Sequence, residues 1–187
     1  MSVKILNLLP VTGDVFTPEM FKYMRKYLEP DTEVQAYQIT SGPPSIECEY
    51  DEALAAPDVL RLAKQGEEDG YQAIFINCFG DPAVKAAREY VDIPVFGGFE
   101  PATHIALGRA NSISIVTVLP NVVPNVEGNV SKARLNGRIV SIRNVNIPVE
   151  ELQDHEKLCK ALAEQSLLAI CEDGAQAVSY THIRAHE

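Results

Sequence analysis

The sequence contains no long hydrophobic run and no excess of basic residues. Its opening apolar segment, Val3 to Val11, is interrupted by Lys4, Asn7 and Pro10, and no later window approaches the roughly 20 apolar residues that a membrane-spanning helix needs. The 16 Lys and Arg against 26 Asp and Glu give a net charge of −10, and the basic residues are dispersed, so a polyanion would be repelled. We therefore expect a cytoplasmic protein that binds neither membrane nor nucleic acid.

The chain also lacks the motifs of common cofactor sites. No G-x-x-x-x-G-K-[ST] and no G-x-G-x-x-G follows a predicted strand, so nucleotide cofactors lack support. The cysteines form no C-x-x-C pair, and no His cluster supplies the spacing of a zinc site. Disulfides are rare in cytosolic proteins, so each cysteine is either a buried apolar residue or a reactive thiol. The cysteines are Cys48, Cys78, Cys159 and Cys171.

Apolar runs of strand length alternate with segments of helical periodicity along the 187 residues. This alternation predicts an α/β fold of parallel sheets joined by right-handed crossovers. The predicted strands cover Val3–Leu9, Glu33–Ile39, Ala73–Ile76, Val95–Phe96, Ser112–Val118 and Arg138–Val145, with a last strand from Ala175. The predicted helices cover Thr17–Leu28, Asp51–Glu68, Pro101–Leu107, Asn125–Leu135 and Val149–Cys171, with one more that opens at Asp81 and Pro82.

One segment of the chain occurs twice. The sequence from Glu68 to Ile74, EDGYQAI, is matched 104 residues later by EDGAQAV, from Glu172 to Val178. A strand, a loop and a long helix precede both copies in the same order, so we predict two related halves, each built on a small parallel sheet. Chance similarity between two helix-to-strand corners is the alternative, because such corners commonly carry acidic residues and glycine.

Cys78 stands at a position where ligands commonly bind. It follows the buried run Ala73–Ile76 and precedes Asp81 and Pro82, whose residue types favour a helix start. Ligands bind at the carboxyl edge of parallel sheets, and a helix N-terminus there lowers a thiol pKa from about 8.5 to roughly 3.5–7.5. An inert, buried cysteine is the alternative. Three further loops at this edge offer hydroxyl and N–H groups for a carboxylate or carbonyl oxygen: Pro10–Gly13, Ser41–Ser45 and Thr117–Pro120.

Several short motifs follow one another in an order that is typical of one family. They include Ser41-Gly42-Pro43-Pro44-Ser45-Ile46-Glu47, Ile76-Asn77-Cys78-Phe79-Gly80-Asp81-Pro82, Glu100-Pro101-Ala102 and Val116-Thr117-Val118-Leu119. Through these segments the chain resembles, over about residues 3–178, the hydantoin racemase branch of the Asp/Glu/hydantoin racemase superfamily.

The resemblance implies two pseudo-symmetric, flavodoxin-like α/β halves, residues 1–97 and 98–178, with the active site in the cleft between them. It also implies catalysis without a metal or an organic cofactor. One cysteine thiolate removes a proton from the carbon next to a carbonyl or carboxylate of a small-molecule substrate, and a thiol opposite returns a proton to the other face. Cys78 is the expected first base. The expected substrate-lining residues are Pro10, Val11, Thr12, Phe79, Gly80, Thr117 and Val118.

Two features depart from the family pattern. The family often has Asn-Pro-Asn-Thr in the first loop, whereas this chain has Leu9-Pro10-Val11-Thr12 and so loses an amide that could hold substrate. The internal repeat places the second catalytic cysteine at residue 182, where this chain has His182, and residues 179–187 resemble no family segment. We therefore expect a truncated or replaced C-terminal end and an inactive chain. His182 as a replacement base is the alternative, because imidazole also titrates near neutrality.

Two other functions remain open. Related enzymes with one cysteine decarboxylate or isomerise small dicarboxylates, and release of CO₂ instead of loss of optical rotation would identify a decarboxylase. A protein that only binds a small molecule would show no turnover at all. Relatives are commonly dimers or larger, so a homo-oligomer is also open.

Overall fold

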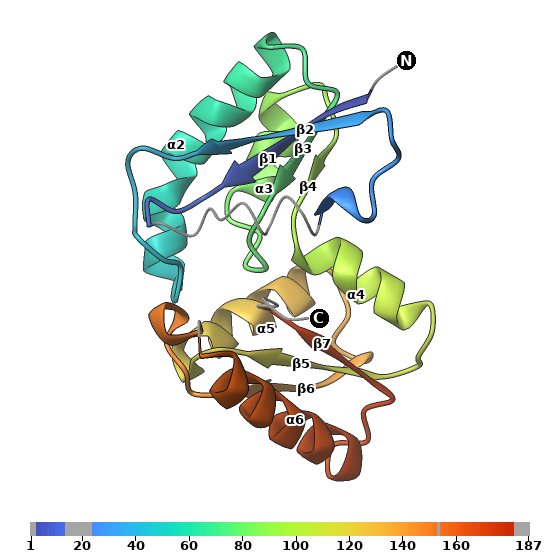
Figure 1. Cartoon of the computed structure of the whole chain (residues 1–187). Helices are drawn as coiled ribbons and strands as arrows, with labels where there is room; N and C mark the ends of the chain where they lie inside the picture. The colour runs from blue at the N-terminus through green and yellow to red at the C-terminus, as the bar shows by residue number, and fades with distance from the viewer. Residues whose placement is uncertain (1–2, 14–23, 153, 182–187) are drawn as a thin grey trace. The chain divides into compact units, whose positions relative to one another are not determined.

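The computed structural model describes residues 3–13, 24–152 and 154–181 of a chain that divides into two compact units. Unit 1 comprises residues 1–46 and 50–97, and unit 2 comprises residues 47–49 and 98–187. Each unit holds one sheet of parallel strands (Figure 1), which confirms the predicted α/β class. The helix predicted over Thr17–Leu28 lies largely outside the described residues. No helix in the described part of the chain is long and apolar enough to cross a membrane.

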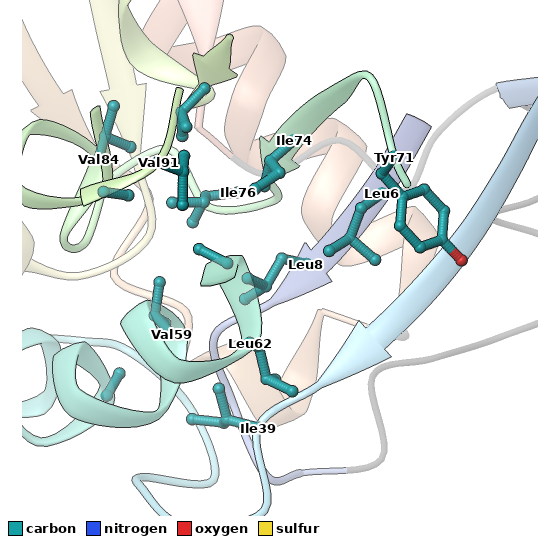
Figure 2. Close-up of a cluster of buried hydrophobic side chains, with 14 of the residues drawn as sticks. Leu6, Leu8, Ile39, Val59, Leu62, Tyr71, Ile74, Ile76, Val84 and Val91 are labelled. Atoms are coloured by element: carbon teal, nitrogen blue, oxygen red, sulfur yellow. The ribbon is translucent and has the colours of Figure 1, made fainter. Parts of the chain in front are cut away.

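Unit 1 is built on four parallel strands in the order β2-β1-β3-β4. Two helices, α2 and α3, cover one face of this sheet and share a buried cluster with its strands (Figure 2). In that cluster Val59 and Leu62 of α2 pack with Leu6 and Leu8 of β1. The elements are β1 (Val3–Leu9), β2 (Thr32–Gln38), α2 (Glu49–Glu68), β3 (Ala73–Ile76), α3 (Val84–Tyr90) and β4 (Val95–Phe96).

Unit 2 is built on three parallel strands in the order β6-β5-β7, with α5 and α6 on opposite faces (Figure 1). The predicted helix over Val149–Cys171 is two elements, because the Asp154 carboxylate accepts the N–H of Lys157 (3.1 Å) and starts α6 there. β7 reaches Tyr180, so this strand includes the first two residues of the segment that we expected to lie outside the family. The elements are α4 (Phe99–Leu107), β5 (Ile113–Thr117), η1 (Pro120–Val122), α5 (Val123–Lys132), β6 (Ile139–Asn144), η2 (Val149–Glu151), α6 (His155–Cys171) and β7 (Ala177–Tyr180).

The two sheets repeat each other in detail. The order β2-β1-β3 of unit 1 corresponds to β6-β5-β7 of unit 2. In unit 1 the N–H of Gln72 donates to the carbonyl of Lys4 (2.8 Å), and the Gln72 side-chain oxygen accepts the N–H of Lys4 (3.0 Å). In unit 2 the N–H of Gln176 donates to the carbonyl of Ser112 (3.0 Å), and its side-chain oxygen accepts the N–H of Asn111 (2.9 Å). The repeated segment therefore lies at the same place in two parallel sheets of corresponding strand order.

Candidate active site

Cys78 lies two residues past the carboxyl end of β3, in a tight turn. The parallel ladder ends at Asn77, whose N–H donates to the carbonyl of Leu8 (2.9 Å). The N–H of Cys78 donates to the carbonyl of Ile76 (2.9 Å), and its own carbonyl accepts the N–H of Asp81 (3.2 Å). The residue as a whole is half-buried, and its side chain packs against the core cluster of unit 1. Cys78 is thus held at the sheet edge where parallel α/β folds bind ligands.

The helix after Cys78 begins later than the sequence predicts. Asp81 and Ala83 have φ values of 55° and 57°, in the left-handed region, so neither residue lies in the first turn of a right-handed helix. The seven-residue α3 begins at Val84 without a side-chain cap, six residues after Cys78. The effect of a helix dipole falls off within the first turn, so the expected lowering of the thiol pKa loses its cause.

The surroundings of Cys78 favour the neutral thiol. Burial raises the pKa of Cys78 to about 12, and the negative charges of Glu52 and Asp81 act in the same direction. A hydrogen bond from the N–H of Gly80 acts against them but does not outweigh them. The direction is opposite to the one we expected from the sequence. Cys78 therefore rests as a protonated thiol that can donate a proton.

The loops after β1 and β2 hold each other at this same edge. The N–H of Thr12 donates to the carbonyl of Pro43 (2.8 Å), and the N–H of Gly13 donates to the carbonyl of Pro44 (3.2 Å). The hydroxyl of Thr12 donates to the carbonyl of Gly42 (3.4 Å). These two N–H groups, which we expected to be open to a substrate anion, are therefore already engaged between the loops.

The predicted lining residues of unit 1 lie together at the carboxyl edge of the sheet. Pro10, Val11 and Thr12 follow β1, while Phe79 and Gly80 follow β3 next to it in the sheet. Phe79 is buried and Gly80 directs its N–H to the Cys78 sulfur. Over residues 3–13, 24–152 and 154–181, no three His, Cys, Asp or Glu side chains form a group that could hold a metal ion.

Unit 2 presents hydroxyl groups at the corresponding edge. Thr117 is the buried last residue of β5, and Val118 follows it. The N–H of Thr181 donates to the carbonyl of Val116 (3.1 Å), and the Thr181 hydroxyl donates to the hydroxyl oxygen of Thr117 (3.2 Å). This backbone bond repeats that of Asn77, 104 residues earlier, so the two units stay in register up to Thr181. His182, the predicted counterpart of Cys78, lies outside the described residues.

The sequence profile of the Asp/Glu/Hydantoin racemase family matches residues 5–179. The chain belongs to this family. The likeness therefore runs from within β1 into β7, and it includes Cys78 and the loops around it.

Individual racemases are similar to this chain over nearly all of its length. A hydantoin racemase of Pseudomonas sp. (strain NS671) is 35% identical over 179 residues, which are 95% of this chain and 71% of that protein. The structure of an allantoin racemase from Klebsiella pneumoniae has a TM-score of 0.89 and 34% identity, and the match covers 96% of this chain and 74% of that one. An allantoin racemase from Pseudomonas fluorescens has a TM-score of 0.89 at 26% identity, covering 95% and 76% of the two chains.

Asp58 of α2 is a residue of this racemase-family chain that the sequence did not single out. Its carboxylate binds the loop that follows β2 and also pairs with Arg61, and this guanidinium holds the pKa of Asp58 down at about 2. A signal was present in the sequence, because Asp58 shares the buried face of a helix with Ala55, Val59 and Leu62. An acid at such a position needs a partner.

Proposed function

We propose that this chain belongs to a cofactor-independent racemase that inverts the carbon next to a carbonyl in hydantoin-like small molecules. One observation carries the proposal. Cys78 stands at the carboxyl edge of the unit 1 sheet and is followed by Phe79-Gly80-Asp81-Pro82. The chain that carries this segment is 35% identical to a hydantoin racemase. Hydantoin and allantoin share an acidified C–H next to a ring carbonyl, and this C–H is the reacting group.

The reaction needs two groups that exchange one proton each with the substrate. A base removes the proton of the substrate C–H, and the electron pair of that bond becomes the enolate, with negative charge on the carbonyl oxygen. An acid on the opposite face then gives its proton to the carbon, which inverts the configuration without net oxidation or reduction. After turnover the two groups have exchanged protonation states, so each enantiomer uses them in the opposite order.

Cys78 is the acid at the start of such a turnover. Its raised pKa supports this role, since a neutral thiol can protonate a carbanion but cannot remove a proton. The partner group must then begin as the base, and we place it at residue 182 from the repeat that keeps Thr181 in register with Asn77.

His182 is the reason why we expect little racemisation from this chain. With a cysteine at one position only, Cys78 serves a single face of the substrate, and inversion depends on whether imidazole replaces the second thiol. His182→Cys therefore should raise racemisation at least about a hundredfold, which is the lower end of what a positioned acid or base contributes. Equal racemisation by His182→Ala and the unchanged chain would show that His182 takes no part.

The test follows separate enantiomers of 5-benzylhydantoin and of allantoin in D₂O. NMR measures the loss of the reacting C–H, and circular dichroism measures inversion, with the spontaneous rate subtracted. In the His182→Cys chain, Cys78→Ser should reduce inversion by about 10²–10⁴-fold, the range of general acid–base catalysis. Cys159→Ser, which changes an exposed cysteine on α6, is the matched control. Full inversion by Cys78→Ser would refute the role of Cys78.

A further inference from the structure

Asp58 is a buried acid that the proposed proton transfer does not use. Only 9% of the residue is exposed, and it lies on the apolar face of α2 beside Ala55 and Val59. A carboxylate in such surroundings is retained only when hydrogen bonds and charges compensate for its lost hydration. Its contacts therefore indicate what it does.

The two carboxylate oxygens of Asp58 have separate partners. Oδ1 accepts from Nε of Arg61, one turn along the same helix, at 2.5 Å. Oδ2 accepts from the loop after β2: the N–H of Thr40 at 2.6 Å, the hydroxyl of Thr40 at 3.2 Å and the N–H of Ser41 at 3.2 Å. One oxygen thus fixes the side chain on its helix, and the other fixes the start of the loop.

The same loop holds the segment after β1 a few residues further on. Its carbonyls at Pro43 and Pro44 accept the N–H groups of Thr12 and Gly13. A Cβ atom at Gly13 would overlap the carbonyl oxygen of Pro44, so only glycine permits this approach. On the other side, the side-chain amide of Gln38 donates to the carbonyl of Gly13 (2.7 Å). The segment after β1 therefore has few ways to move independently of the loop.

We propose that Asp58 is a positioning residue that sets the Pro10–Thr12 segment through the loop of residues 40–44. No atom of Asp58 needs to touch substrate for this role. Loss of its Oδ2 contacts releases Thr40 and Ser41, and the carbonyls of Pro43 and Pro44 then lose their fixed places opposite Thr12 and Gly13. The identity of the ligand that contacts this segment rests on the proposed function. The structural link from Asp58 to Thr12 rests only on the hydrogen bonds described above.

The test compares hydrogen exchange in Asp58→Asn and Glu67→Gln. Glu67 is a matched control, because it is also a carboxylate of α2. It forms an ion pair with Lys64, three residues away on the helix, and it accepts the backbone N–H of Asp92 in a loop. Asp58→Asn should speed exchange about tenfold at residues 40–41 and also at Thr12 and Gly13. Glu67→Gln should speed exchange only near residue 92. In both variants β3 should remain protected.

Three results would overturn the inference. Faster exchange at residues 40–41 with unchanged exchange at Thr12 and Gly13 would show that the loop does not transmit the change. Unchanged exchange at both places would deny Asp58 any role. Equal acceleration throughout unit 1, β3 included, would indicate a merely structural role. If Asp58→Asn does not fold, Thr40→Val removes the hydroxyl contact alone, and unchanged exchange at Thr12 in that variant also contradicts the inference.

A binding measurement separates this inference from the proposed function. Calorimetry with 5-benzylhydantoin should show about tenfold weaker binding to Asp58→Asn than to Glu67→Gln. The rate of Cys78 alkylation should change less than about twofold, because the Cys78 turn keeps its own contacts. Absence of hydantoin binding to every variant would count against the proposed function, while the exchange result would still decide the role of Asp58. Equal affinity of the two variants for hydantoin would refute a positioning effect on the ligand.

Discussion

The two units of the chain have one scaffold and different chemistry at their edges. In each unit a glutamine, Gln72 or Gln176, ties the start of the third strand to the start of the first strand through one backbone and one side-chain hydrogen bond. At the opposite edge, unit 1 carries the thiol of Cys78, whereas unit 2 carries the hydroxyls of Thr117 and Thr181. Backbone pairing has been retained at one end of the strands, and side chains differ at the other end, where parallel sheets bind ligands.

The contacts that close the helix-to-strand corners also differ. In unit 1 the Asp69 carboxylate accepts from the hydroxyl of Tyr37 (2.7 Å). In unit 2 the corresponding Asp173 accepts from Nε of Arg143 (2.6 Å) and from its Nη2 (2.9 Å). The same aspartate position of the repeat thus binds a neutral hydroxyl in unit 1 and a charged, bidentate guanidinium in unit 2. The repeat therefore preserves geometry more strictly than it preserves charge.

Cysteine reactivity should show the largest difference between the units. Cys159 and Cys171 are exposed on α6 of unit 2, whereas Cys78 is half-buried with a pKa that burial raises to about 12. Iodoacetamide at pH 8 should therefore modify the two exposed thiols at least about a hundredfold faster than Cys78. Because the thiolate forms only as the pH rises toward 12, the Cys78 rate should increase about tenfold per pH unit. Mass spectrometry of the peptides measures each rate.

The unfolded chain in urea is the control for that experiment, since all four cysteines should then react at similar rates. Rapid labelling of Cys78 in the folded chain at pH 7 would contradict the neutral-thiol state. It would also restore the first-base role that the sequence suggested for Cys78.

Stability should respond more strongly to the corner of unit 2 than to that of unit 1. Asp173→Asn removes a charge-assisted contact whose partners, Asp173 and Arg143, are only 21% and 20% exposed, and should cost about 2 kcal/mol of unfolding free energy. Tyr37→Phe removes the neutral hydroxyl that donates to Asp69 and should cost about 1 kcal/mol. Urea titrations followed by circular dichroism measure both. Equal losses would mean that the charged pair adds nothing beyond a neutral hydrogen bond.

Acid should distinguish the charged corner from the neutral one. Arg143 lowers the pKa of Asp173 from 3.8 to about 2, so the folded state holds this carboxylate ionised where the unfolded state would protonate it. Its contribution is complete above pH 4 and disappears as the pH falls through about 2. The deficit of Asp173→Asn should therefore shrink on acidification, whereas that of Tyr37→Phe should not follow the same course. A deficit that stays constant down to pH 2 would exclude the charge as its cause.

Local patterns in the sequence predicted the scaffold but not the state of the thiol. Ala73–Ile76 is a strand with the predicted bounds, as expected of a continuous apolar run in a parallel sheet. Val3–Leu9 also has its predicted bounds, although Lys4 and Asn7 interrupt its apolar residues. The predicted start of α3 was wrong. Asp81 and Pro82 have the residue types of a helix start, but the helix begins at Val84. The Asp81 carboxylate instead occupies the space that a Cβ atom would take at Gly97. That contact joins residues distant in sequence, so no local pattern could have revealed it.

The prediction of open N–H groups in the loop after β1 was wrong for a related reason. The residue types of Thr12 and Gly13 predict open N–H groups, but the fold brings the carbonyls of Pro43 and Pro44 against them. The pKa of Cys78 depends likewise on Glu52, which is 26 residues away in the sequence. Residue types indicated where the site is, while long-range contacts determine which of its groups are available.

The smallest predicted effect is an equality between the units. Gly70 and Gly174 end the helices before β3 and β7 with φ values of 83° and 73°, and a Cβ atom at either would meet no other atom within 4 Å. Alanine at either position should therefore cost about 1 kcal/mol from backbone strain alone, and the two losses should agree. Gly128→Ala is the matched control, because Gly128 has equally open surroundings inside α5, where alanine should stabilise by up to about 1 kcal/mol. Unequal losses at the two corners in urea titrations would show that the repeat shares its strand order without sharing the energetics of its turns.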